Sequence, residues 1–192
     1  MSAVSGGRRV LVVVGAVVLL AACGGTSRSD FEAEIQSRGG GLGSGLALDA
    51  LAALEAELGE VPPLRSFTMT NGQVSMEVLV PGTDDQVDTY RYGTSGLYGG
   101  GGLSAPTPVT GVGGAQALRR SLFRTERVAF DEFDQVVDTA IEEADLEGGY
   151  AQTLRVDRAT ERPRITVNVT SPRESVQAQF RVDGRPLRTG DG

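Results

Sequence analysis

The amino-acid sequence predicts an α+β protein, in which two αβββ units form an antiparallel sheet covered on one face by helices, after a cleaved N-terminal segment. Three observations predict it. Apolar residues recur at helical spacing in two stretches, three alternating apolar and polar segments follow each stretch, and an uninterrupted apolar run stands near the N-terminus. Helical spacing and period-two alternation both indicate elements with one buried face. A sheet with one apolar face needs helices over that face, which gives a two-layer sandwich.

The helices of the first unit, predicted over residues 30–92, come first in the chain. A short helical pattern opens at Asp30, and the glycine-rich segment 39–45 ends it as a hinge. A second helix is predicted over 47–58, because its apolar residues fall on one stripe and Gly59 follows.

Three strands complete this unit. Asn71-Gly72 is a strong signal for a two-residue hairpin turn between the first two strands. A Pro-Gly turn at Pro81-Gly82 leads into the third strand. That strand carries Asp88, Tyr90 and Tyr92 on one face.

Residues 93–114 are rich in glycine and proline and are predicted to form a long loop or a linker. The second unit is predicted over 115–188, and 189–192 form a tail. A short helix is expected over 117–123. A clearer helix follows with Asp131 as its N-cap, and Gly148-Gly149 is expected to stop it.

Three further alternating segments predict the strands of the second unit. Their apolar residues are Leu154 and Val156, then Ile165, Val167 and Val169, then Val176, Ala178, Phe180 and Val182. Turns are expected at Pro163, at Ser171-Pro172-Arg173 and at Asp183-Gly184.

The two units keep nearly the same internal spacing. Val78 and Val167 are 89 positions apart, and the helix-ending Leu58 and Leu146 are 88 apart. Helix, strand, strand, strand in tandem is similar to PepSY-type domains and to β-lactamase inhibitor proteins. This resemblance covers residues 47–188 as an order of elements, and a likeness of order does not by itself assign a function.

The N-terminal 22 residues have the features of a signal peptide. Arg8-Arg9 form a basic region, and the 13 apolar residues Val10–Ala22 follow. A helix of this length rises about 20 Å, less than the roughly 30 Å hydrocarbon core of a bilayer. The run is therefore predicted to be a cleaved export signal, by either the general secretory or the twin-arginine route.

The end of this run, Leu20-Ala21-Ala22-Cys23, resembles the bacterial lipobox. The resemblance implies that a signal peptidase recognises Leu20, Ala21 and Ala22, and that Cys23 carries a lipid. Acyl chains on Cys23 would then hold the protein in the cell membrane, on its outer face. Residues 23–29 would form a flexible tether. The alternative is an ordinary cleaved signal with an incidental cysteine.

Composition narrows the classes of partner. All 18 basic residues are arginine, which is typical of a GC-rich bacterial genome such as an actinobacterium's. The part from Cys23 onward carries 16 Arg against 25 acids, a net charge near −9. This charge repels phosphate backbones and headgroups, so no nucleic acid is expected as a partner and attachment would rest on the lipid. A single cysteine allows no internal disulfide.

The sequence lacks the residue types that the common catalytic and zinc-binding arrangements require. Without His or Lys, and with the one Cys acylated, no Ser-His-Asp, Cys-His or zinc site is expected, and no cofactor. A carboxylate-only hydrolase is one alternative. Its candidate groups are Asp84, Asp85 and Asp88, which are also consistent with a turn, and Asp131, Glu132 and Asp134, which are also consistent with a helix N-terminus. The other alternative is a carrier for a small apolar ligand.

Tyr90, Tyr92 and Tyr98 lead into the glycine-rich segment and are candidates for a binding surface, because tyrosine offers contact area at low entropic cost. Alternatively, Tyr90 and Tyr92 cover one face of the sheet. Exclusion of the other classes favours a non-catalytic, lipid-anchored binding module whose partner is an unknown envelope protein or small ligand.

Overall fold

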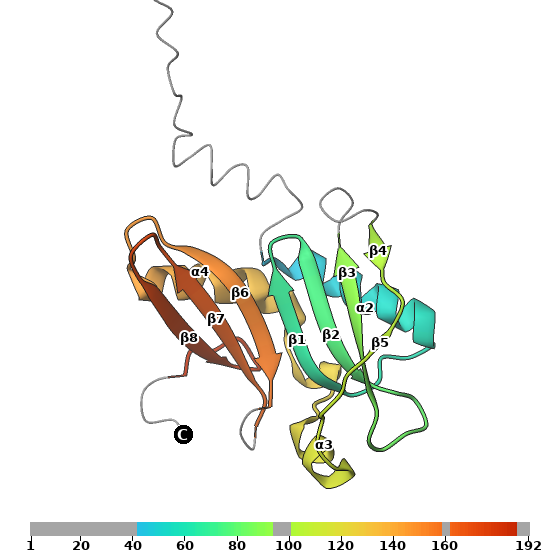
Figure 1. The fold of residues 1–192 in the computed structure, drawn as a ribbon. Coiled ribbons are helices and arrows are strands. Elements are labelled where there is room, and N and C mark those ends of the chain that lie inside the picture. Colours follow the sequence, from blue (N-terminus) through green and yellow to red (C-terminus); the bar gives the residue numbers. More distant parts are fainter. Residues whose placement is uncertain (1–41, 94–100, 159–161, 188–192) are drawn as a thin grey trace, which may run out of the picture.

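The computed structural model describes residues 42–93, 101–158 and 162–187 (Figure 1). The predicted signal peptide, lipobox and tether lie outside these ranges, as do the pattern at Asp30, residues 39–41 of the glycine-rich segment, and Tyr98.

The described chain is α+β, with one antiparallel sheet of eight strands, as the sequence predicts for the fold class. The strands are β1 (Leu64–Thr70), β2 (Gln73–Leu79), β3 (Val87–Gly93), β4 (Gly102–Leu103), β5 (Thr107–Pro108), β6 (Tyr150–Asp157), β7 (Arg164–Thr170) and β8 (Ser175–Arg181). Their order across the sheet is β4-β3-β2-β1-β6-β7-β8, with β5 also paired to β3. Strands from both halves of the chain therefore share one sheet.

The seam between the halves is the antiparallel pair β1 and β6. Five residue pairs join them, from Ser66 opposite Asp157 to Thr70 opposite Thr153. Sequence patterns leave open whether the two halves form continuous or separate sheets, and this pair makes them continuous.

The β1–β2 hairpin turns at Asn71-Gly72, as predicted. Gly72 has φ +70°, a conformation that glycine adopts without the steric cost of a Cβ atom. The flanking strands alternate as their sequences indicate, with Val74, Met76 and Val78 buried on β2.

Three helices are described: α2 (Ser44–Leu58), α3 (Ala115–Ser121) and α4 (Phe133–Ala144). Figure 1 shows α2 and α4 on the same face of the sheet, with α2 behind β2 and β3 and α4 behind β6 to β8. We call α2, α4 and the residues flanking them, 44–60 and 130–147, the helix layer.

The core lies between the helix layer and the sheet. Its centre is a group of three aromatic rings, in which Phe67 of β1 contacts Phe130 at a centroid distance of 4.9 Å and Phe133 at 6.2 Å. Phe67 and Phe133 have no exposed surface. Edge-to-face aromatic contacts therefore fix the start of α4 against the middle of the sheet.

The predicted N-cap of this helix is wrong. Asp131 lies inside a 3₁₀ turn, η2 (Phe130–Glu132), and the N-cap is Glu132, whose side chain makes no capping hydrogen bond. Burial of Phe130 in the core draws residues 130–132 into the tighter turn, so the helix begins one residue later than an N-cap at Asp131 predicts.

The other end of α4 also differs from the prediction. The helix ends at Ala144, and Asp145 takes the left-handed conformation at φ +46°. Asp145 is therefore the terminating residue in place of Gly148-Gly149, because aspartate tolerates this conformation better than most side chains.

Between β3 and α4, the described part of the glycine-rich segment follows the edge of the sheet, where β4 and β5 pair with β3. Helix α3 and a second 3₁₀ turn, η1 (Thr125–Arg127), come next. Phe123 then bridges to Leu64 at the start of β1. Two residues of this corner, Val87 and Leu118, are buried outside the main core cluster.

Candidate functional site

The sheet has a second face, on the side away from α2 and α4, and we call it the open face. Cross-strand register arranges most of its side chains in three rows from β3 to β8, which Leu79 and Val87 continue at one end and Tyr150, Thr170 and Ser175 at the other. The first row is Thr89, Glu77, Ser66, Asp157, Arg164 and Arg181; the second is Arg91, Ser75, Thr68, Arg155, Thr166 and Gln179; the third is Gln73, Thr70, Thr153, Asn168 and Gln177. These rows hold hydroxyls, amides, guanidiniums and two carboxylates, and no aromatic or purely aliphatic side chain.

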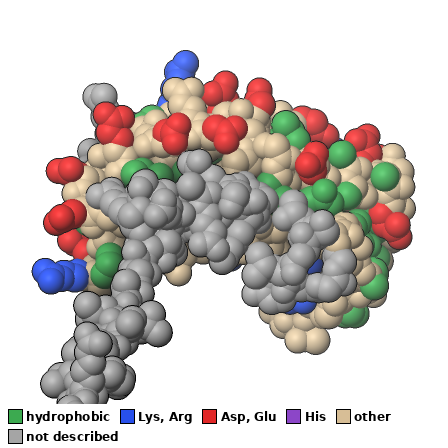
Figure 2. Space-filling view, turned by 90° about the horizontal axis from the view of Figure 1, so that it is seen from above, with side chains coloured by type: hydrophobic (Ala, Val, Ile, Leu, Met, Phe, Trp, Pro, Cys, Tyr) green, Lys and Arg blue, Asp and Glu red, His purple; other side chains and the backbone are tan. Residues whose placement is uncertain are grey.

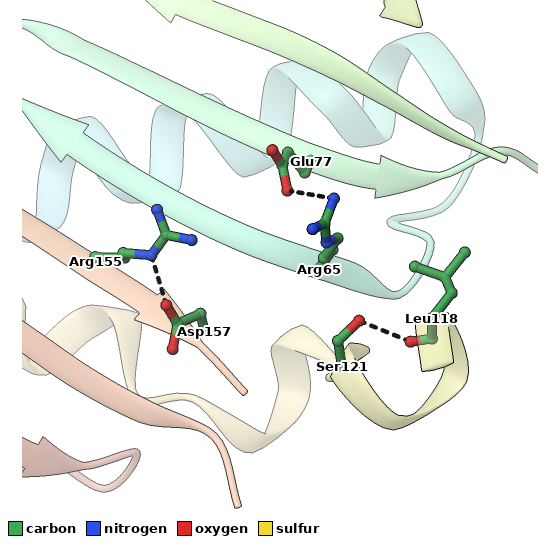
Figure 3. Close-up of polar contacts among 6 residues, drawn as sticks. All are labelled: Arg65, Glu77, Leu118, Ser121, Arg155 and Asp157. Carbon is green, nitrogen blue, oxygen red and sulfur yellow. Dashed lines mark hydrogen bonds and ion pairs between the residues drawn. The ribbon is translucent and has the colours of Figure 1, made fainter. Parts of the chain in front are cut away.

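Figure 3 shows two of the ion pairs on the open face. Arg65, at a bulge in β1, is 3.6 Å from Glu77 on β2. Arg155 and Asp157, two positions apart on β6, form the other pair at 2.5 Å. Figure 3 shows all four side chains in front of the strands, with α2 behind the sheet. Partly exposed pairs of this kind contribute little to stability.

Further arginines extend the positive charge toward the β8 edge. Arg164 of β7 lies directly opposite Arg181 of β8. Like charges in this position are unfavourable. The two side chains turn to different neighbours: Arg164 donates a hydrogen bond to Gln179 Oε1 at 3.3 Å, and Arg181 lies 3.7 Å from Asp183. At the other side of the sheet, Arg91 is exposed on β3.

The helix layer has the opposite charge. Residues 44–60 and 130–147 contain twelve acids and no arginine. Figure 2, seen from above, shows acidic side chains gathered along the margin on which the helices lie. The net charge of −7 is therefore distributed unevenly, since half of the acids lie in the helix layer and five arginines point from the strands to the open face.

The tyrosines proposed from sequence lie on the other side of the sheet. Tyr90 is 6% exposed and belongs to the core cluster, and Tyr92 packs against that cluster. Burial, together with the nearby carboxylates of Asp88 and Glu57, raises the pKa of the Tyr90 phenol. Both positions match the alternative that these tyrosines cover one face of the sheet. Tyr98 lies outside the described residues.

The candidate carboxylates do not converge on one point. Asp84 and Asp85 are exposed in the turn before β3, and Asp84 pairs with Arg119 of α3 at 3.1 Å. Asp88 is on β3, opposite the core residue Val78.

Asp134 makes a structural contact with α2. Its carboxylate Oδ2 accepts a hydrogen bond from the backbone N–H of Ser44 at 3.3 Å. The carbonyl of Asp131 accepts another from the Ser44 hydroxyl at 2.9 Å. Within 42–93, 101–158 and 162–187, no group of three or more acidic or other metal-ligating side chains could hold a metal ion.

Sequence reasoning did not single out the open face. The signal was present in the polar positions of each strand, which alternate with the buried ones and repeatedly carry Thr, Ser, Gln, Asn or Arg. In the sequence alone, such positions indicate only the solvent-exposed face of a sheet. The strand order is needed to show that they form one continuous surface.

No protein family, curated protein or solved structure matches the chain. None of the helices that the structure describes is long and apolar enough to cross a bilayer.

Proposed function

We propose that this protein is a lipid-anchored binding module of the bacterial cell envelope, held by acyl chains on Cys23 at the outer face of the cell membrane. Its contact surface is the open face of the sheet. A non-catalytic role is part of the proposal, and so is a tandem repeat of two αβββ units that share the sheet.

The anchor is supported by the order of features at the N-terminus: Arg8-Arg9, the apolar run, and Leu20-Ala21-Ala22 before the single cysteine. Two or three acyl chains hold a protein stably without any protein span, because each buried methylene contributes about 0.8 kcal/mol.

One observation carries the binding role. The open face is a continuous, mainly polar surface of six strands, which neither α2 nor α4 covers. Most of its side chains are hydrogen-bonding groups held at fixed spacing by the ladder, which suits recognition of another surface. The edges of the sheet are less suited to binding a partner, because β4 and β5 pair with β3 at one edge and residues 185–187 return along β8 at the other.

The repeat is supported by the spacing of the two halves and by the sheet order. Reading outward from the seam, β1, β2 and β3 lie on one side and β6, β7 and β8 on the other. Each set of three is preceded by a helix that packs on the same face.

The anchor is tested by intact-mass analysis and membrane fractionation of the full-length protein in a GC-rich Gram-positive host, beside Cys23→Ala. We expect a lipid-modified mass beginning at Cys23, and accumulation of the unprocessed precursor for the variant. A wild-type product that is unmodified and leaves the membrane fraction would refute the anchor.

The contact surface is tested separately in the same cells by placing a photo-crosslinking amino acid at one position at a time. Thr68 and Thr166 sample the open face, and Asp138 and Glu142 are matched positions on α4. We expect discrete crosslinked products from the first pair only. Products from α4 alone would move the contact surface to the helix layer.

A further inference from the structure

The separation of charge between the two faces identifies the chemistry of the partner. The open face carries Arg65, Arg91, Arg155, Arg164 and Arg181 against Glu77, Asp157 and, beside Arg181, Asp183. It is a positively charged surface on a protein whose total charge is −7. Such a surface attracts an anionic partner, while the helix layer repels it and so orients its approach.

The arginine pair of β7 and β8 is an independent indication. Arg164 and Arg181 stand directly opposite each other, which costs folding free energy in the isolated protein. A carboxylate placed between two guanidiniums would remove this repulsion and would form charge-assisted hydrogen bonds with both. Asp157 faces Arg164 and Asp183 lies 3.7 Å from Arg181, so an incoming carboxylate would add to the negative charge that the chain itself places beside the pair.

The other side chains of the open face favour a protein over a membrane or a polyphosphate. Glu77 and Asp157 lie among the arginines, so the open face suits a partner whose acidic groups alternate with hydrogen-bond donors better than a uniformly anionic membrane or polyphosphate. The rows also offer amides and hydroxyls that both donate and accept hydrogen bonds, which match the mixed donors and acceptors of a protein surface.

The size of the open face agrees with this choice. Adjacent strands are about 4.8 Å apart, so the rows run roughly 24 Å from β3 to β8, and they span about 13 Å along the strands. With side chains included, the area is on the order of 600 Å² on this protein, near the lower end for specific protein–protein interfaces.

We propose that the open face binds an acidic surface of a second protein, whose carboxylates contact Arg91, Arg155 and the pair formed by Arg164 and Arg181. This inference rests on the proposed binding function and specifies its partner. Arginine suits such an interface because its planar fork binds a carboxylate through two parallel hydrogen bonds.

The probe is a short peptide of alternating glutamate and serine that carries a fluorophore and a photo-crosslinking group. It is titrated into the full-length protein in nonionic detergent. We expect binding that weakens as salt is raised, since the contacts are charged and solvent-accessible. The triple variant Arg91→Gln, Arg164→Gln, Arg181→Gln should bind about tenfold more weakly or worse.

The matched control removes three arginines that are exposed outside the open face, Arg124, Arg127 and Arg173. Its total charge change is the same, so a general electrostatic effect would weaken binding equally in both variants. Circular dichroism shows that each variant is folded. Crosslinked sites mapped on the wild-type protein provide a second result that does not depend on any variant, and they should fall on the open face.

Several results would overturn the inference. These are equal losses in the two triple variants, crosslinks that map to the helix layer, or no binding of the peptide at low salt. Salt-dependent binding to phosphatidylglycerol vesicles without peptide binding would assign the open face to lipid headgroups. Self-association in sedimentation that is lost with the open-face arginines would assign it to the acidic helix layer of a second copy.

Failure of this inference is distinguishable from failure of the proposed function. The crosslinked products formed in cells at Thr68 and Thr166 are compared between the wild type and the open-face triple variant. Products that are unchanged in the triple variant would support the binding function and would contradict an acidic partner. Loss of the lipid-modified mass concerns the anchor alone.

Discussion

Ser44 and Asp134, ninety positions apart in the chain, exchange two hydrogen bonds across the N-termini of α2 and α4. The backbone N–H of Ser44 donates to Asp134 Oδ2 at 3.3 Å, and the backbone N–H of Asp134 donates to Ser44 Oγ at 3.2 Å. Neither helix has a capping side chain at its own N-cap position, Gly43 or Glu132. Each helix therefore receives from the other the acceptor that its first turn requires.

Removing this exchange should destabilise the fold. Asp134→Ala takes away an acceptor for α2 and a negative charge near two helix N-termini, so we expect a loss of about 1–2 kcal/mol in the free energy of unfolding. Asp134→Asn keeps an acceptor oxygen and should lose less. Urea denaturation of both variants measures the difference.

A double-mutant cycle tests whether the two residues act together. The loss in Ser44→Ala with Asp134→Ala should be smaller than the sum of the single losses, because either substitution alone breaks the exchange. Strictly additive losses would mean that the two residues stabilise their helices independently.

The aromatic group at the centre of the core should be the most sensitive part of the fold. Phe133→Ala deletes a fully buried ring that contacts Phe67 and Phe130, and we expect it to cost about 3–5 kcal/mol. Leu48→Ala is the control, because Leu48 is on α2 and 46% exposed. Chemical denaturation of the two variants should differ clearly, and a similar small loss in both would place the centre of the core elsewhere.

The continuous sheet predicts that both halves of the chain unfold together. Met69 and Leu154, opposite each other on β1 and β6, are both fully buried, so separating the halves would expose core residues on each side of the seam. We expect one transition in thermal unfolding, with the calorimetric enthalpy equal to the van't Hoff enthalpy. Two resolved transitions would show that the halves are separate folding units.

Tyr90 should make stability depend on alkaline pH. Its pKa is raised in the folded protein, first by burial and then by Asp88 and Glu57. In the unfolded chain the phenol loses its proton near pH 10, before the folded protein does. The contribution of Tyr90 to the free energy of unfolding is therefore complete below about pH 10, and it is lost as the pH rises from there through the folded-state pKa of Tyr90.

Urea denaturation between pH 8 and pH 11 measures this effect. Tyr90→Phe has no proton to lose at this position, so its stability should fall less steeply above pH 10, while the remaining tyrosines contribute to both proteins. Equal slopes for the two proteins would show that ionisation of Tyr90 is not linked to folding.

Much of the fold follows from local patterns in the sequence. Alternation predicts the strands around Val74, Met76 and Val78 and around Ile165, Val167 and Val169, because one face of each strand is buried. Asn71-Gly72 predicts the hairpin because the turn needs a residue with positive φ. These signals act between neighbours in the chain, so the sequence shows them directly.

The wrong prediction at the start of α4 has a cause in the tertiary structure. Asp131 resembles an N-cap, but packing of Phe130 and Phe133 against Phe67 moves the helix start to Phe133, and Ser44 supplies the hydroxyl that accepts from the Asp134 N–H. Contacts between residues far apart in the chain outweighed a local preference worth about 1 kcal/mol.

The sequence by itself determined the α+β class, the hairpin turn, the buried face of each long strand and the excess of acid, because these depend on residue type and short-range spacing. It also supplies the whole basis for the proposed lipid anchor at Cys23. Only the tertiary structure decided that β1 pairs with β6, that the caps of α2 and α4 are shared, and that five arginines gather on one face with about half of the acids in the helix layer on the other. Pairing across the seam closes a long loop, and its register is selected by burial of both strands' apolar faces at once, which short-range patterns in a single sequence do not specify.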